Sequence, residues 1–402
     1  MFAASDKQFY ISTRSRTSGT KMQPRKLPIA LVGCGGIMGA HLGGYRDLYT
    51  RGIRVFDIRA TCDTVESMAR EKAEAVANFQ ESRPKVYTNL EEVLRNQNIE
   101  AVDIGLPHNI HHTIASKCLE EGLDVIIEKP LAITMRAAKV IIEKAQRSGR
   151  TLAVAENYRR SPANRAIWWA IREGLLGDPR MIMYTSAGYS TQAWGWRESR
   201  FSAGGSWVFD GGVHIADLDR YQIHREAIDV YAVQDTFDPV KNGINVTVDD
   251  MTMAIIRYEG RVYSQWIWTR AAPGKSTYSR IIHGSKGSVN EESLMMHREG
   301  GLEVYGLNNL IERMNKDLSQ EEKERMFPGG ATDTFSTELH DFYDSIVNKR
   351  KPEVDGHEAY KDMAITLGFY ESAVSGRPIR VSDVEELVIE EYQKEINEKV
   401  GI

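Results

Sequence analysis

The strongest constraint on the fold is the regular alternation of short β-rich runs with amphipathic helical stretches over residues 27–156. The runs predicted as strands are 29–32, 56–62, 86–87, 101–106, 124–127 and 151–155. Strands that alternate with helices are typical of βαβ units, in which neighbouring strands run parallel and helices cover the sheet. This segment therefore predicts a parallel, doubly wound α/β sheet.

After residue 160 the pattern changes, because the helix signals end near Gly174 and β-rich runs dominate. The runs predicted as strands are 181–186, 228–233, 251–258, 261–269, 280–283 and 302–305, and the predicted late helices are 334–349 and 357–375. Such runs favour a largely antiparallel sheet, with a hairpin turn at Glu259-Gly260. Because 402 residues exceed one ordinary core of about 250, we predict two domains, 27–156 and 157–402.

Composition narrows the class of protein. A net charge of −5 and a pI near 6.1 indicate no nucleic-acid partner, and no apolar run approaches the roughly 18 residues of a membrane helix. The three cysteines stand far apart, which favours a reduced, cytoplasmic protein. Residues 1–26 are basic and rich in Ser and Thr, so we predict a disordered tail. The alternatives are an organelle transit peptide or residues upstream of a start at Met22.

A glycine-rich loop follows the first predicted strand, and it reads Gly33, Cys34, Gly35, Gly36, Ile37, Met38 and Gly39. Glycines let the backbone turn tightly and approach a pyrophosphate, which the free amides at the next helix start attract. Met38 occupies the place of the third glycine of the usual fingerprint. The loop predicts a dinucleotide site or, taken alone, only a tight turn.

A carboxylate, Asp63, follows the second predicted strand. At this point a carboxylate can accept hydrogen bonds from both hydroxyls of an adenosine ribose, and it repels a 2′-phosphate. Asp63 lies further from Gly33 than the roughly 20 residues usually seen, which we ascribe to an insertion near 46–54. We therefore predict NAD as the cofactor, with NADP less favoured. The alternative is a solvated carboxylate at a strand end.

The strand predicted at 124–127 is followed by Glu128, Lys129 and Pro130. Ligands of open parallel sheets bind at the carboxyl ends of the strands, so Lys129 is expected to face the cofactor. A lysine there can hold a substrate hydroxyl, and burial with nearby positive charge would lower its pKa for proton transfer. An isolated lysine at a strand end is otherwise more often a surface residue.

A second polar group lies in the segment that contains Asp210 and His214. If the chain is helical from Phe209 onward, these two side chains share one face, with Asp217 further along it. A histidine suits general base catalysis, and an adjacent carboxylate would orient it and stabilise its protonated form. We therefore expect Asp210 to support His214. The alternative is an ordinary helix-surface contact or a structural histidine in the core.

In their order along the chain, these motifs resemble those of the Gfo/Idh/MocA family of sugar and cyclitol oxidoreductases. The motifs are 33–39, 105–111, Glu128-Lys129-Pro130, Asn157-Tyr158-Arg159, 210–214 and 376–378. The resemblance runs from about residue 27 to 381. It implies an N-terminal Rossmann domain and a C-terminal α/β domain, whose large, mostly antiparallel open sheet often forms subunit interfaces.

The resemblance also implies roles for individual residues. It places Lys129, Asp210 and His214 at the catalytic positions, with Tyr158 and Arg159 beside the substrate. The predicted cofactor contacts are Gly33, Gly35, Gly36, Ile37, Met38, Asp63, Leu106, Pro107, Asn109, His111, Glu128 and Lys129.

Two further groups were considered for ligand binding. Trp194, Trp196 and Arg197 lie in one loop, where indoles can pack on a sugar ring and an arginine can bind its hydroxyls; the alternative is an oligomer contact or loop packing. The histidines at 108, 111 and 112 have no cysteine or carboxylate at ligand spacing, so we expect no metal.

Together these features predict an NAD-dependent dehydrogenase that oxidises a secondary hydroxyl of a sugar, glycoside or cyclitol, or reduces the corresponding ketone. One alternative is a redox-cycling enzyme that cleaves a glycoside, and another is a non-catalytic regulator that senses NAD. We expect a homodimer or homotetramer formed through the C-terminal sheet, with no nucleic-acid or membrane partner.

Overall fold

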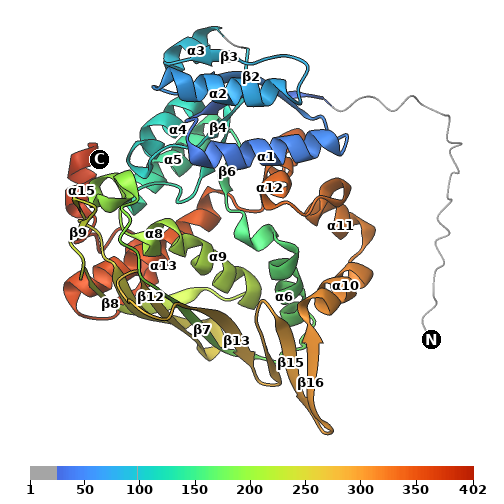
Figure 1. The fold of residues 1–402 in the computed structure, drawn as a ribbon, viewed down its shortest axis with the longest axis vertical. Coiled ribbons are helices and arrows are strands. Elements are labelled where there is room, and N and C mark those ends of the chain that lie inside the picture. Colours follow the sequence, from blue (N-terminus) through green and yellow to red (C-terminus); the bar gives the residue numbers. More distant parts are fainter. Residues whose placement is uncertain (1–24, 97) are drawn as a thin grey trace, which may run out of the picture.

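The computed structural model describes residues 25–96 and 98–402 (Figure 1). The predicted tail therefore lies outside the described residues, apart from Arg25 and Lys26. In the described part of the chain, no helix is long and apolar enough to cross a membrane.

The first half of the described chain forms a six-stranded sheet in the order β3-β2-β1-β4-β5-β6, with every pair parallel. Its strands are β1 (Leu27–Val32), β2 (Phe56–Cys62), β3 (Lys85–Tyr87), β4 (Ala101–Ile104), β5 (Asp124–Glu128) and β6 (Leu152–Ala155). β1, β4, β5 and β6 are buried along their whole length because helices cover both faces. The predicted parallel sheet is confirmed, and its strand order reverses between β1 and β4.

Helices connect these strands and lie on both sides of the sheet (Figure 1). They are α1 (Gly36–Thr50), α2 (Glu66–Ala77), α3 (Leu90–Asn96), α4 (His111–Glu120) and α5 (Met135–Ser148). Local chemistry sets the ends of α5: the Thr134 side chain accepts a hydrogen bond from the Ala137 amide, and Gly149 ends the helix at φ 65°.

The second half is built on a large sheet, which in the described residues has nine strands in the order β16-β15-β14-β13-β7-β12-β11-β8-β17. They are β7 (Pro179–Ala187), β8 (Ala227–Asp235), β11 (Met251–Tyr258), β12 (Val262–Thr269), β13 (Thr277–Gly284), β14 (Gly287–Val289), β15 (Ser293–Arg298), β16 (Gly301–Gly306) and β17 (Ile379–Arg380). Only β7 and β12 pair in parallel among these described strands, so the mostly antiparallel sheet is confirmed. The sequence pattern did not predict the short strands β14, β15 and β17. A separate small hairpin joins β9 (Val240–Lys241) and β10 (Ile244–Asn245).

One face of the large sheet is covered by helices, and the other is bare (Figure 1). The helices of this half are α6 (Pro162–Arg172), α7 (Arg200–Ala203), α8 (Trp207–Asp210), α9 (Gly212–Ile223), α10 (Leu307–Asp317), α11 (Gln320–Met326), α12 (Thr334–Val347), α13 (Gly356–Ser375), α14 (Val381–Glu385) and α15 (Lys394–Val400). Trp266 and Tyr184 point into the covered face and are buried. Side chains on the bare face, such as Met253 and Ile255, are exposed.

The late helix α12 returns to the first domain and packs against α1 (Figure 1). A glycine makes this close approach possible, because a Cβ on Gly44 of α1 would lie 2.8 Å from the carbonyl carbon of Phe335 in α12. The helix that follows the glycine loop is thereby held against the second domain.

Candidate active site

The glycine loop has a backbone that only glycine allows at its first position. Gly33 has φ +86°, and a Cβ there would lie 2.3 Å from the Gly105 carbonyl oxygen. A Cβ on Gly35 or Gly36 would meet no atom within 4 Å. Gly35 caps α1 without a side-chain hydrogen bond, so the first amides of this helix are free to bind a pyrophosphate. The loop fits the predicted dinucleotide.

Asp63 lies beside this loop, as the strand-end argument requires. Its Oδ2 accepts a hydrogen bond from the Cys34 amide at 2.8 Å, and its Oδ1 accepts one from the Val65 amide at 2.8 Å. The carboxylate is thus fixed at the edge where a ribose would lie. Met38, in contrast, is fully buried and lies next to Gly105 in the interior, so its side chain packs α1 on the sheet and does not face a cofactor.

The loop after β4 also reaches this edge of the sheet. Leu106, Pro107 and Asn109 are half-buried there and stay predicted cofactor contacts. His111 is fully buried, with Nδ1 3.0 Å from the Pro130 carbonyl oxygen and Nε2 2.8 Å from the Leu106 carbonyl oxygen. The ring thus joins two loops inside the protein, and the cofactor contact of His111 stays a prediction.

Lys129 follows β5 and reaches across to the second domain. Its Nζ donates to the carbonyl oxygen and to Oδ1 of Asp210, both at 2.8 Å. Burial alone would lower the pKa of Lys129, but the charges of Asp210 and Glu128 outweigh it and raise the pKa. The predicted lowering is therefore wrong. An ammonium has three N–H groups, which leaves one to donate to a substrate oxygen.

Asp210 lies at a break between two helices. α8 ends at Asp210 and α9 begins at Gly212, so the single helix expected from Phe209 onward is not formed. The indole of Trp207 packs at the break, since a Cβ on Gly211 would lie 2.3 Å from it. Asp210 is hydrogen-bonded to Lys129, whereas the side-chain partner of His214 is Glu156.

The carboxylate of Asp210 contacts three basic side chains. Besides Lys129, it accepts a hydrogen bond from Arg197 Nε and lies 3.5 Å from His108 Nε2. Burial would raise the pKa of Asp210, but the Lys129 charge, with His108 and Arg197, holds it well below its usual range. Asp210 is thus an ionised carboxylate that holds Lys129 in place.

His214 is oriented by a different carboxylate, Glu156. The His214 Nδ1 lies 2.6 and 2.7 Å from the two carboxylate oxygens of Glu156, and the Tyr158 ring stacks on the imidazole at 3.8 Å. Among the described residues, Nε2 of His214 has no hydrogen-bond partner. Burial would raise the pKa of Glu156, but the charges of His214 and Arg159 lower it. Sequence reasoning missed Glu156, although it follows β6 just as Lys129 follows β5.

The loop with the two indoles contributes part of the site. The Arg197 guanidinium lies over the Trp196 ring at 4.3 Å, and the Trp196 ring meets His108 edge-on at 4.8 Å. Both residues therefore flank Asp210, as a substrate wall would. Trp194 is not brought to this cluster: its ring lies under the Arg270 guanidinium at 4.5 Å, and its substrate contact stays a prediction.

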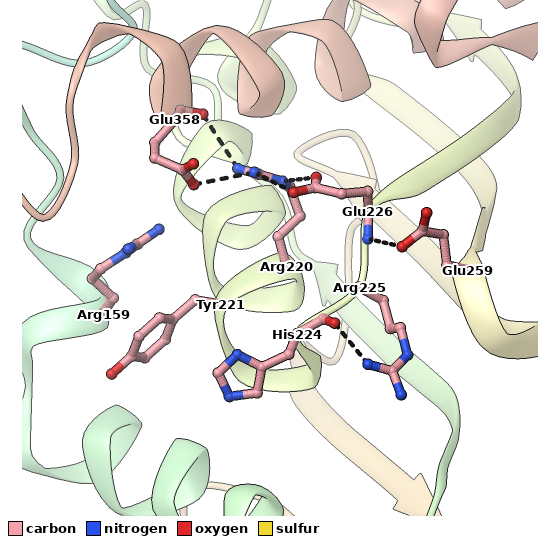
Figure 2. A pocket seen from close by; sticks show the side chains of 8 residues that line it. All are labelled: Arg159, Arg220, Tyr221, His224, Arg225, Glu226, Glu259 and Glu358. Atoms are coloured by element: carbon pink, nitrogen blue, oxygen red, sulfur yellow. Dashed lines mark hydrogen bonds and ion pairs between the residues drawn. The ribbon is translucent and has the colours of Figure 1, made fainter.

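Arg159 belongs to an interior ion pair. It is buried, and its Nε donates to Asp217 Oδ2 at 2.9 Å, while its substrate contact stays a prediction. It also borders a pocket of about 330 Å³ at the far end of α9 from His214 (Figure 2). There Arg220 donates to Glu226 at 2.7 Å and to Glu358 at 3.1 Å. This pocket contains none of the three predicted catalytic side chains.

Among the residues that the structure describes, no group of three or more His, Cys, Asp and Glu side chains could hold a metal ion.

The parallel sheet with its glycine loop, and the lysine and histidine at its carboxyl edge, define a dinucleotide-dependent oxidoreductase. Family models agree: an oxidoreductase family with an NAD-binding Rossmann fold matches residues 27–156, and its C-terminal α/β domain matches residues 169–381. The chain belongs to the Gfo/Idh/MocA oxidoreductase family.

Individual relatives act on sugars by name. The chain is 26% identical over 327 residues to a 1,5-anhydro-D-fructose reductase of Ensifer adhaerens, covering 81% of this chain and 93% of the relative. It is 30% identical over 224 residues to a levoglucosan dehydrogenase of Pseudarthrobacter phenanthrenivorans, covering 49% of this chain and 56% of the relative. A solved levoglucosan dehydrogenase in complex with NADH shares the fold, with a TM-score of 0.74 and 23% identity over 89% of this chain and 99% of that one.

Proposed function

We propose that this protein is an NAD-dependent dehydrogenase that oxidises a secondary hydroxyl of a sugar, glycoside or cyclitol, or reduces the corresponding ketone. The observation that carries the proposal is the position of two pairs at the carboxyl ends of adjacent strands. Lys129 follows β5 and is held by Asp210, and Glu156 follows β6 and holds His214. The sugar-converting relatives support a carbohydrate substrate.

Lys129 and Asp210 position the substrate oxygen in this proposal. The third N–H of the Lys129 ammonium donates to that oxygen and stabilises the negative charge that develops on it. Asp210 keeps the ammonium protonated and fixed through its two contacts at 2.8 Å. NAD, when bound, accepts a hydride from the substrate carbon.

His214 takes the hydroxyl proton. Its Nε2 accepts the proton, while Nδ1 stays hydrogen-bonded to Glu156 at 2.6 Å. The buried Glu156 carboxylate selects the tautomer with its proton on Nδ1 and stabilises the imidazolium that forms. In the reducing direction the same proton returns to the substrate oxygen.

The proposal is tested with a panel of polyols, aldoses, anhydrosugars and glycosides, with NAD or NADP, followed by the absorbance of the reduced nicotinamide. Replacing Lys129 by Met or His214 by Asn should lower kcat by roughly 10²-fold or more and leave the Kd of NADH nearly unchanged. Unchanged kcat in both variants would contradict the proposal. Glycoside cleavage without net NADH would favour the redox-cycling alternative instead.

We also propose that the bare face of the large sheet forms the contact between subunits of a homodimer or homotetramer. Its exposed apolar side chains, on neighbouring strands in register, are Met181, Met183, Tyr231, Val233, Met253, Ile255 and Tyr263. A contiguous apolar patch of this kind is typical of a protein contact.

A further inference from the structure

Behind the active site lies a group of buried ionisable side chains that the proposed mechanism does not use. We call it the His41 cluster: His41, Asp103, Glu128 and Glu338. The exposed fractions of these residues are 0%, 0%, 6% and 1%, respectively. They come from α1, β4, β5 and α12, so the cluster spans both halves of the chain.

His41 bridges two carboxylates. Its Nδ1 lies 2.9 Å from Asp103 Oδ2, and its Nε2 lies 2.9 Å from Glu128 Oε1. A carboxylate only accepts hydrogen bonds, and a neutral imidazole can donate from one nitrogen alone. With both carboxyl groups ionised, the two contacts are both hydrogen bonds only if the ring is doubly protonated. Burial opposes this charge, but the neighbouring Asp103 and Glu128 carboxylates raise the pKa of His41 well above its usual value.

Glu338 is the third carboxyl group beside this ring. Its Oε1 lies 4.0 Å from His41 Nε2, and in the described part of the chain neither of its oxygens has a hydrogen-bond partner. A buried, unpaired carboxylate would be very costly, so the neutral acid is the stable form. Burial accordingly raises the pKa of Glu338 well above its usual range.

Glu128 connects this cluster to the catalytic lysine. While Oε1 contacts His41, Oε2 accepts a hydrogen bond from the backbone amide of Lys129 at 3.0 Å. The carboxylate thus holds the backbone at the point from which the Lys129 side chain departs. His41 and Lys129 therefore contact the two oxygens of one carboxylate, which connects the ring to the backbone of Lys129.

Resting on the proposed function of Lys129, we infer that His41 is a positioning residue for catalysis. Its imidazolium anchors Glu128, Glu128 fixes the backbone of Lys129, and Glu338 stands beside the ring as a neutral acid. A misplacement of about 1 Å at a catalytic group can cost roughly 10²-fold in rate. The alternative is that the cluster only packs α1 against the sheet and α12.

The test compares His41→Gln, Glu128→Gln and the double variant with a matched control, Tyr45→Phe. Tyr45 is buried on the same helix and donates to Asp103 Oδ2 at 3.0 Å, but it belongs to the branch that does not lead to Lys129. For each protein, kcat is measured with the best substrate of the sugar panel, the Kd of NADH by fluorescence titration, and stability by thermal unfolding.

We expect His41→Gln and Glu128→Gln each to lower kcat by roughly 10²-fold. In His41→Gln, whose side chain is not a predicted cofactor contact, the Kd of NADH should change less than about threefold. The double variant should lose no more than the worse single variant, because both break one connection. Tyr45→Phe should keep kcat even where it loses stability. Glu338→Gln, which imitates the neutral acid, should also keep kcat within about threefold.

Several outcomes would overturn the inference. These are equal losses of kcat in His41→Gln and Tyr45→Phe, losses that multiply in the double variant, or a loss in Glu338→Gln as large as in His41→Gln. If His41→Gln does not fold, a folded Glu128→Gln with unchanged kcat overturns it as well. The kcat of Lys129→Met is measured in parallel. If Lys129→Met keeps its kcat, the proposed function is contradicted. If Lys129→Met loses its kcat while His41→Gln keeps it, only the inference about His41 is contradicted.

Discussion

At the scale of single residues, two carboxylates divide the work that sequence reasoning assigned to one. Asp210 holds Lys129 at 2.8 Å, and Glu156 holds His214 at 2.6 Å. The proton-accepting ring and the charged lysine are therefore fixed independently. This separation lets each partner be tested without disturbing the other.

Replacing Glu156 by Gln is expected to lower kcat by about 10²-fold or more, because a neutral amide does not stabilise the imidazolium of His214. The Kd of NADH should stay nearly constant. Steady-state kinetics and fluorescence titration measure both quantities. Glu371→Gln is the matched control, since Glu371 is also fully buried but accepts hydrogen bonds from Tyr392 and Gln393. Equal losses in both variants would argue against the role of Glu156.

Asp63 tests the choice of cofactor. Replacing it by Asn removes the charge that repels a 2′-phosphate. The Asn side chain keeps one oxygen, which can accept the hydrogen bond that the Cys34 amide donates to Asp63 Oδ2 at 2.8 Å. We expect the ratio of kcat/KM for NAD to that for NADP to fall by about tenfold or more, equivalent to about 1.4 kcal/mol. An unchanged ratio would mean that another group selects the cofactor.

At the scale of elements, close backbone approaches decide where helices and loops sit. Gly33 brings the cofactor loop against the loop after β4, and Gly44 brings α1 against α12. These contacts join segments that lie far apart in the chain, so no local sequence pattern predicts them.

Gly33→Ala is expected to destabilise the protein by about 2 kcal/mol and to weaken NADH binding, because its Cβ would lie 2.3 Å from the Gly105 carbonyl oxygen. Gly52→Ala is the control: Gly52 has a similar φ of +82° but would meet no atom within 4 Å. Chemical unfolding and NADH titration of both variants separate the steric effect from the backbone conformation. Equal effects in the two variants would refute the steric explanation.

A half-buried carboxylate, Glu353, connects α6 to the segment before α13. It accepts hydrogen bonds from Arg165 at 2.5 and 2.7 Å and from Arg160 at 3.2 Å. Burial would raise the pKa of Glu353, but the charges of Arg165 and Arg160 hold it well below its usual value. A depressed pKa adds stability that is present above the usual glutamate pKa and is lost as the pH falls below it.

Glu353→Gln should therefore cost about 3 kcal/mol of unfolding free energy at pH 7, because the buried Arg165 guanidinium loses its counter-charge, whereas Arg160 keeps Asp341 at 3.1 Å. The difference from the unmodified protein should shrink as the pH falls below the usual glutamate value of 4.5. Urea unfolding over this pH range measures it. A difference that does not change with pH would contradict the ion-pair explanation.

At the scale of the whole molecule, the two sheets have different surroundings. Helices cover both faces of the parallel sheet, whereas the large sheet has one bare face (Figure 1). The side chains exposed on that face include apolar ones such as Met253 and Ile255. Burying such a face removes apolar area from water at about 25 cal/mol per Å². The architecture thus leaves one surface suited to a second copy of the chain.

Ile255→Glu is expected to shift the protein toward monomers, because Ile255 lies in the middle of the bare face and is 55% exposed. Light scattering after size-exclusion chromatography measures the mass of the assembly. Arg70→Glu, on the exposed surface of α2, is the control and should not change it. An oligomer that survives Ile255→Glu would place the subunit contact elsewhere.

Much of this protein is determined by the sequence alone. The alternation of strands and helices over 27–156 is local and periodic, so it predicts the parallel sheet, and the carboxyl-end rule places Lys129 at the site edge. The order of motifs identifies the family, and the glycine loop identifies the cofactor site.

Only the tertiary structure decided which charges meet. Lys129 and Asp210 are 81 positions apart, and His214 and Glu156 are 58 apart, so their pairing depends on how two domains pack. The charge of Lys129 depends on the same packing, because burial and nearby carboxylates oppose each other and the second effect wins. Sequence periodicity predicts which residues form a helix or a strand. The pKa of a side chain and its hydrogen-bond partner depend instead on which residues the folded chain brings together.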